Sequence, residues 1–329
     1  VKEVLKRQGY KCIEVKEQCE PRGDFLNTKS PNPEEKAAYD VALTYAKDKD
    51  VDFICSNDPD CDRIGIVVFD KDKNPVYLTG NQTGAMLIYY VLSSRKAKGL
   101  LPENGVIYNT IVTSPLGAKV AALFNVSTEQ TLTGFKYIGD KIKKSIENNG
   151  KIFQFGYEES YGYLINPAVR DKDGVQAVMM ICEMASYFKH QGKTLLEVYD
   201  AIQQKLGYYI ESQYNYKAPG LAGVTLISNL MKLYRESDLS IIANEKVAIK
   251  EDYLSLERNE NGNITHLDYE QSNVLRYVFE DGSFIAIRPS GTEPKLKVYY
   301  SIKAENELPK TKEEMKDQML DEFCITSRK

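Results

Sequence analysis

Short apolar runs alternate with longer segments of helical apolar spacing along much of this chain, and this alternation limits its fold more than any other feature. Residues 37–45 place apolar side chains on one face of a helix that begins near residue 33, and an apolar run at 51–55 follows. A helix that leads into a buried strand is typical of a βαβ unit. The first part of the chain therefore predicts an α/β fold.

Further segments of both kinds follow along the chain. Strands are predicted at 12–15, 106–108 and 152–155, and helices at 82–92, 117–124, 137–148 and 175–191. Beyond about Gly207, one or two helices mix with strand signals at 208–212, 246–250 and 273–279. We therefore expect two successive α/β domains followed by an α+β C-terminal domain, at 1–78, 79–206 and 207–329.

Composition excludes several classes of protein. The chain has 329 residues, enough for two or three domains, and 42% of them are hydrophobic and 27% charged. Its net charge of -4 argues against a general nucleic-acid binder, and no apolar run is long enough to span a membrane. Two histidines, and six cysteines without a CxxC pair, argue against a zinc site and predict reduced thiols in a cytoplasmic protein.

Three aspartates stand at alternate positions in a short loop between two predicted strands, at Asp58, Asp60 and Asp62. Their carboxylates can face one hard cation, and their mutual repulsion is strong unless such a cation neutralises it. An EF-hand is excluded because Arg63 and Phe69 replace the glycine and glutamate that its loop requires. The loop therefore predicts a magnesium site completed by a phosphate oxygen, with a solvated acidic turn as the alternative.

A second polar loop, at 288–295, lies between two predicted strands near the C-terminal end. Ser290 and Thr292 offer hydroxyl donors, and Gly291 lets the backbone approach an anion closely. Arg288 and Lys295 add positive charge at the two ends of the loop. The loop predicts a phosphate cradle, although an ordinary polar turn uses the same residue types.

A third polar segment follows the predicted strand at 152–155. Its residues Glu158 and Ser160 can accept and donate hydrogen bonds to neighbouring hydroxyl groups, as a sugar site requires. Taken alone this signal is weak, because a similar sequence in a surface turn usually has no function. Sugar binding is the functional interpretation of this segment.

Taken together and in this order, the three loops resemble those of the α-D-phosphohexomutase family, and most closely its phosphoglucomutase branch. The resemblance extends over nearly the whole chain, from about residue 1 to residue 301. It implies that the catalytic contacts are Arg63 and Lys172 and that Asp58, Asp60 and Asp62 hold Mg²⁺. The implied contacts to the sugar phosphate are Thr133, Glu158, Ser160, Arg288, Ser290, Gly291, Thr292 and Lys295.

The resemblance also implies a reaction. In this family a phosphoserine gives its phosphoryl group to a sugar phosphate, and the resulting bisphosphate returns its other phosphoryl group. For this chain the expected reaction interconverts glucose 1-phosphate and glucose 6-phosphate, with glucose 1,6-bisphosphate as intermediate or activator. Phosphomannomutase, phosphopentomutase and a non-catalytic sugar-phosphate-binding protein stay open as alternatives.

One part of the family pattern has no counterpart in this sequence. The phosphoserine belongs to a Ser-His-Asn-Pro loop in the family's first domain, and no Ser-His dipeptide occurs here. The segment at 30–33 reads Ser-Pro-Asn-Pro and has no histidine. The sequence also starts at Val1, directly within a helical pattern. We therefore expect a fragment that is inactive alone and whose partner is the N-terminal domain of the same protein.

Overall fold

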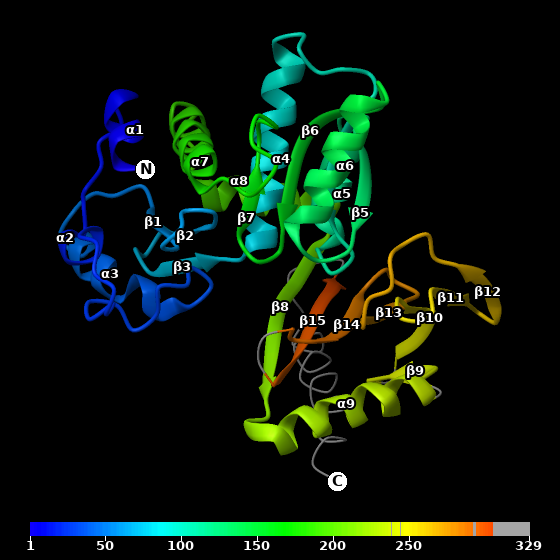
Figure 1. Cartoon of the computed structure of the whole chain (residues 1–329). Coiled ribbons are helices and arrows are strands. Elements are labelled where there is room, and N and C mark those ends of the chain that lie inside the picture. The colour runs from blue at the N-terminus through cyan, green and yellow to red at the C-terminus, as the bar shows by residue number, and fades with distance from the viewer. Residues whose placement is uncertain (238, 244, 292–293, 305–329) are drawn as a thin grey trace. The chain divides into compact units, whose positions relative to one another are not determined.

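The computed structural model describes residues 1–237, 239–243, 245–291 and 294–304. The chain divides into two compact units, Val1–Leu206 and Gly207–Lys329, which we describe separately (Figure 1). Among the helices of the described ranges, none has the length and apolarity needed to cross a bilayer.

The first unit begins with short helices and a small antiparallel sheet. The helices are α1 (Lys2–Arg7), α2 (Lys16–Cys19), the 3₁₀ helix η1 (Lys36–Tyr39) and α3 (Asp40–Ala46). The sheet consists of β1 (Ile54–Asn57), β2 (Ile64–Phe69) and β3 (Pro75–Leu78) in the order β1-β2-β3. One side of it packs on a cluster that includes Tyr39, Ala42 and Val67. Helix η1 and helix α3 thus cover β1 and β2.

The predicted strand at 12–15 was wrong. Residues 11–15 have no regular structure, and β1 pairs with β2 rather than with this segment. The side chain of Ile13, which suggested a buried position, is 48% exposed. A segment with no neighbouring strand cannot pair its backbone N–H and C=O groups as a strand in a sheet does. A short apolar pattern alone was therefore not enough to predict a strand.

A parallel sheet forms the centre of the rest of the first unit. Its strands are β4 (Gly105–Thr110), β5 (Ser127–Thr131), β6 (Ile152–Glu158) and β7 (Gly162–Leu164), in the order β5-β4-β6-β7. Strands β5, β4 and β6 are parallel and β7 is antiparallel to β6. The carboxyl ends of the three parallel strands therefore meet at one edge of the sheet.

Helices cover both faces of this sheet. They are α4 (Gly80–Ala97), α5 (Pro115–Ala122), α6 (Phe135–Glu147), α7 (Gly174–Lys189) and α8 (Leu195–Leu206). Helix α6 buries Phe135 and Ile138 against one face. On the opposite face the ring of Tyr157 lies against Gly84 of α4 and Gly117 of α5, where a side chain has no room. The glycines thus allow both helices to approach the sheet closely.

In the residues that the structure describes, the second unit consists of one large antiparallel sheet and one helix. The elements are β8 (Tyr208–Lys217), α9 (Gly220–Glu236), β9 (Ile241–Ile242), β10 (Glu245–Asp252), β11 (Glu257–Glu260), β12 (Asn263–His266), β13 (Leu275–Phe279), β14 (Phe284–Pro289) and β15 (Lys295–Ala304). The strand order is β12-β11-β10-β13-β14-β15-β8, and β9 pairs with β10. Helix α9 buries Ile227, Leu230 and Met231 in a cluster with β13, β14 and β15.

The predicted fold class, two α/β parts followed by an α+β part, is confirmed. Strand β5 and helix α8 were not predicted. Strand β5 reads Ser-Thr-Glu-Gln-Thr and lies at the edge of its sheet, so it carries little of the apolar alternation on which strand prediction depends. The division of the first unit at 78/79 stays a prediction.

Helix α4 should depend on its N-terminal cap. The Thr79 hydroxyl accepts a hydrogen bond from the Gln82 N–H at 3.2 Å, and the Gln82 amide oxygen accepts from the Thr79 N–H at 2.9 Å. Such a capping box satisfies backbone donors that the helix leaves unpaired. We expect Thr79→Ala to lower the free energy of unfolding by about 1 kcal/mol in urea denaturation followed by circular dichroism.

Thr44→Ala is the matched control for this variant. The Thr44 hydroxyl donates to the Val41 carbonyl within α3 and caps no helix, so its loss should change stability by less than about 0.5 kcal/mol. Equal effects of the two substitutions would contradict the importance of the cap.

Candidate functional site

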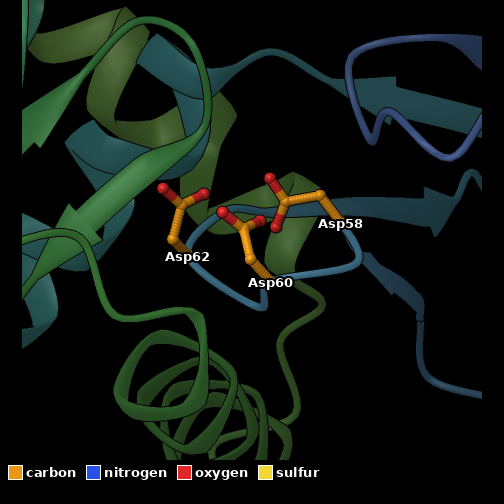
Figure 2. Close-up of side chains that lie close together, drawn as sticks. All are labelled: Asp58, Asp60 and Asp62. Atoms are coloured by element: carbon orange, nitrogen blue, oxygen red, sulfur yellow. The ribbon is translucent and has the colours of Figure 1, made fainter.

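The three aspartates lie together in the turn between β1 and β2. One carboxylate oxygen from each of Asp58, Asp60 and Asp62 lies within 4.8 Å of the other two. Figure 2 shows the three side chains projecting to the same side of the loop. The turn is tightened by Cys61, whose φ is 56° and whose N–H donates to the Asp58 carbonyl at 3.0 Å. The spacing that suggested a cation site thus produces a cluster of oxygen ligands.

Arg63 pairs with the most buried of these carboxylates. Asp58 is 3% exposed and accepts hydrogen bonds from the Arg63 N–H at 3.0 Å and from Arg63 Nε at 2.6 Å. Burial acts to raise the pKa of Asp58, but the hydrogen bonds from Arg63 outweigh it and hold this pKa below its usual value. Asp58 is therefore ionised at neutral pH.

The other end of the Arg63 guanidinium is held by a turn that precedes η1. Arg63 Nη1 donates to Glu34 Oε1 at 2.9 Å and to Asn32 Oδ1 at 3.4 Å. The Asn32 carboxamide oxygen also accepts from the Glu34 N–H at 3.1 Å, which fixes the turn. The arginine is therefore immobilised by carboxylates on two sides. No pattern in the sequence indicated the part played by Glu34.

Asp62 has one oxygen paired and one without a hydrogen-bond donor. Its Oδ2 lies 2.9 Å from Lys172 Nζ. Its Oδ1 is buried and accepts no hydrogen bond from the described part of the chain, with Arg63 Nε at 3.6 Å. Burial raises the pKa of Asp62, while Lys172 acts to lower it. A buried carboxylate oxygen without a donor is costly, and a cation at the triad would satisfy it, so these residues fit Mg²⁺.

Lys172 connects the aspartate loop to the parallel sheet. Besides Asp62, its ammonium lies 3.0 Å from Asp171 Oδ1 and 5.6 Å from the centre of the Phe135 ring. Its side chain runs across Gly162 of β7, where an added Cβ would lie 2.7 Å from Lys172 Cγ. Only glycine at this position leaves room for the lysine to reach Asp62.

Backbone hydrogen bonds fix the aspartate loop to the segments around it. The Ile64 N–H donates to the Tyr161 carbonyl at 3.0 Å, beside a bridge between Arg63 and Gly162. The Gly174 N–H at the start of α7 donates to the Cys61 carbonyl at 2.9 Å. The aspartate loop and the loop after β6 are therefore parts of one rigid arrangement within the first unit.

Glu158 lies at the carboxyl end of β6 and is 7% exposed. Its Oε1 accepts a hydrogen bond from the Gly134 N–H at 2.7 Å, next to Thr133 in the turn between β5 and α6. Ser160 follows in the turn after β6 and is partly exposed. Burial first, and then the charge of Glu159, raise the pKa of Glu158 to about 7. The predicted sugar contacts Thr133, Glu158 and Ser160 thus share the carboxyl edge of the sheet.

The predicted phosphate loop lies in the second unit, at the hairpin between β14 and β15. Arg288 is paired with Lys297 in the sheet register, and the Ser290 N–H donates to the Lys295 carbonyl at 2.8 Å. Gly291 is exposed at the turn. Thr292 lies outside the described residues. The hairpin brings Arg288, Ser290 and Lys295 to one end of the sheet.

Comparison with known proteins identifies the family. Models described as Phosphoglucomutase/phosphomannomutase match consecutive parts of the chain: alpha/beta/alpha domain II at 1–71, alpha/beta/alpha domain III at 79–206 and the C-terminal domain at 236–318. A phosphoglucomutase of Staphylococcus haemolyticus is 38% identical over 309 residues, which are 93% of this chain and 55% of that protein. The chain belongs to the phosphoglucomutase/phosphomannomutase family, and it spans about half the length of the curated relatives it matches.

Solved structures share the fold. The pp63/parafusin phosphoglucomutase of Paramecium, in its open form, superposes with a TM-score of 0.63 at 22% identity over 94% of this chain and 52% of that one. A putative phosphomannomutase of Thermus thermophilus gives a TM-score of 0.65 at 16% identity over 100% of this chain and 57% of that one. Identities this low establish similarity of fold and nothing further.

The raised pKa of Glu158 should make stability depend on pH. The folded protein binds this proton more tightly than the unfolded chain does, because the pKa rises from 4.5 to about 7 on folding. The stabilisation from the protonated carboxyl is complete below the lower pKa and is lost as pH rises through the higher one. We expect Glu158→Gln to gain stability relative to wild type, by on the order of 3 kcal/mol, between about pH 5 and about pH 8.

Urea denaturation at several pH values measures this difference. Asn104→Ala, at an exposed position before β4, removes no ionisable group and is the control, so its difference from wild type should not vary with pH. A pH-independent difference for Glu158→Gln would show that the buried carboxyl does not titrate in this range.

Proposed function

We propose that the whole protein is a phosphoglucomutase that interconverts glucose 1-phosphate and glucose 6-phosphate. The observation that carries this proposal is the contact between Lys172 Nζ and Asp62 Oδ2 at 2.9 Å. It joins the acidic triad to a lysine beside the loop that carries Glu158 and Ser160. The predicted metal-binding carboxylates, the Lys172 ammonium and the predicted sugar contacts therefore belong to one part of the chain. The relatives from Staphylococcus haemolyticus and Staphylococcus epidermidis, 38% and 36% identical to this chain, are both named phosphoglucomutase. This name favours glucose over mannose or a pentose as the sugar.

Asp58, Asp60 and Asp62 would hold Mg²⁺, as the unsatisfied Asp62 oxygen supports. When bound, the ion would neutralise charge on a phosphoryl group during its transfer. Its other ligand would come from a phosphoserine in the remaining, N-terminal part of the protein. We infer that the present chain is inactive alone for want of that serine.

The residues of this chain would bind and orient the sugar phosphate and neutralise its charge. Arg63 is held by Asp58 and Glu34, and Lys172 is held by Asp62, so both would provide positive charge in fixed positions. Phosphoryl transfer depends mainly on such charge stabilisation and alignment. Thr133, Glu158 and Ser160 would bind hydroxyl groups of the sugar.

The phosphate that does not react would bind at the hairpin of the second unit. Its contacts there would be Arg288, Ser290, Gly291, Thr292 and Lys295. Binding energy from this distant group would position the reacting end of the substrate. Between the two transfers, glucose 1,6-bisphosphate would turn around so that its phosphates exchange places.

We also propose that the domains of the chain are 1–78, 79–206 and 207–329.

Magnesium should stabilise the chain through the triad. A ligand that binds only the folded state raises the melting temperature as its concentration exceeds its dissociation constant. We expect MgCl₂ to raise the melting temperature of wild type, relative to KCl at equal ionic strength, and to have no such effect on Asp60→Asn. Asp72→Asn, in the exposed turn between β2 and β3, should keep the full response. A response in Asp60→Asn equal to that of wild type would remove the magnesium site.

Arg288 should be needed for the binding of sugar phosphates. We expect Arg288→Ala to weaken the binding of glucose 6-phosphate by about 1.5 to 3 kcal/mol in calorimetry, the range for hydrogen bonds to charged groups. Arg7→Ala removes an arginine from the surface of α1 and should leave binding unchanged. An unaltered dissociation constant for Arg288→Ala would refute the phosphate cradle.

A further inference from the structure

The loop after β6 contains a second glutamate, Glu159, to which the reaction above gives no part. Glu158 Oε1 accepts its hydrogen bond from Gly134, at the start of α6. Glu159 Oε2 instead accepts from the hydroxyl of Thr110, the last residue of β4, at 2.9 Å and from that of Thr113, in the turn between β4 and α5, at 3.3 Å. Neighbouring carboxylates thus bind two different segments at the carboxyl edge of the sheet, Glu158 the start of α6 and Glu159 the end of β4.

The two threonines form a preorganised donor pair. Thr110 is 0% and Thr113 is 1% exposed, and their hydroxyl oxygens lie 2.9 Å apart. The Thr113 hydroxyl also accepts from the Thr110 N–H at 3.1 Å. Buried hydroxyls need partners, and hydrogen bonds to an ionised carboxylate are stronger than those between neutral groups. The Glu159 carboxylate is therefore held firmly by the β4–α5 turn.

The main chain of Glu159 is held from another side. A Cβ at Gly80, the first residue of α4, would collide with the carbonyl group of Glu159, so the two backbones are in close contact. The Gly80 carbonyl in turn accepts a hydrogen bond from the Tyr163 hydroxyl at 3.1 Å. Glu159 is thus fixed both at its main chain, against α4, and at its carboxylate.

We propose that Glu159 is a positioning residue, which through Thr110 and Thr113 holds the turn so that Glu158 and Ser160 can bind the sugar together. The inference rests on the proposed function, because it assigns the sugar to that turn. Glu158 and Ser160 flank Glu159 in the chain, so a displacement of its main chain moves both. A turn that must be ordered on binding weakens affinity, whereas one ordered beforehand does not.

Glu159 also influences Glu158 through its charge. The charged groups that act on Glu158 are Glu159 in the same turn and Asp171 and Lys172 in the segment before α7, while the Gly134 N–H donates to it from the start of α6. Glu159→Gln removes one of the negative charges, and Thr110→Val keeps it while removing a hydrogen bond. The two substitutions therefore separate the charge of Glu159 from its attachment.

Calorimetry of glucose 6-phosphate binding to the 329-residue chain tests the attachment. We expect Thr110→Val and Glu159→Gln to raise the dissociation constant about fivefold or more, and Thr110→Ser, which keeps the hydroxyl, to restore it within about twofold. Thr128→Val is the control, since the Thr128 hydroxyl in β5 finds no partner within the described ranges. Circular dichroism verifies that each variant is folded.

Titration of the Glu158 carboxyl by NMR tests the charge without any ligand. Its pKa should fall in Glu159→Gln and stay within about half a unit of wild type in Thr110→Val. If wild type binds glucose 6-phosphate and both variants bind it equally well, the positioning role is overturned and the proposed function stands. If wild type does not bind the sugar phosphate, the assignment of Glu158 and Ser160 as sugar contacts of this chain fails and the positioning role fails with it, whereas the activity of the whole protein is tested separately by turnover of glucose 1-phosphate.

Discussion

Three carboxylates that lie within 4.8 Å of one another impose the main electrostatic constraint on the first unit. Such a cluster is unstable unless positive charge surrounds it. Arg63 pairs with Asp58 and Lys172 pairs with Asp62, at 2.6 Å and 2.9 Å. Each of these cations needs its own support, from Glu34 for the arginine and from Asp171 for the lysine. The acidic loop thus orders segments that are far apart in the chain.

The parallel sheet provides the second organising element. Because β4, β5 and β6 are parallel, their carboxyl ends bring three turns to one edge. Glu158 and Glu159 bind two of these turns, one at Gly134 and one at Thr110, so the loop after β6 is attached across the edge of the sheet. The same loop is joined to the aspartate turn through the hydrogen bond from Ile64 to Tyr161. The predicted metal-binding and sugar-binding residues of the first unit therefore lie on turns that strands and helices support.

In the second unit, strand register fixes the backbone of the predicted phosphate loop at its two ends. Its hairpin between β14 and β15 belongs to a long antiparallel sheet, in which Arg288 is placed by register opposite Lys297. The register of the sheet places the basic residues Arg288 and Lys295 at this end. In the proposed function this hairpin would bind the phosphate that does not react.

The sequence by itself determined the fold class, the aspartate loop and the residues at the ends of β6 and β14. These depend on short-range patterns, such as helical spacing, alternate carboxylates and glycine in a polar turn, which act within a few residues. The predicted strand at 12–15 and the unpredicted strand β5 show where that range ends. Strand formation depends on a neighbouring strand, and local residues do not reveal whether one exists.

Only the tertiary structure decided that Glu34 holds Arg63, that Lys172 reaches Asp62 and that Glu159 binds Thr110. These contacts join residues separated by 29, 110 and 49 positions along the chain, respectively. Nothing in the local sequence of Glu34 or Glu159 distinguishes these side chains from solvated charges, and Arg63 and Lys172 were predicted only through the resemblance of their segments to the family. Their partners are selected by the packing of strands and helices, so these contacts became visible only once the chain was folded.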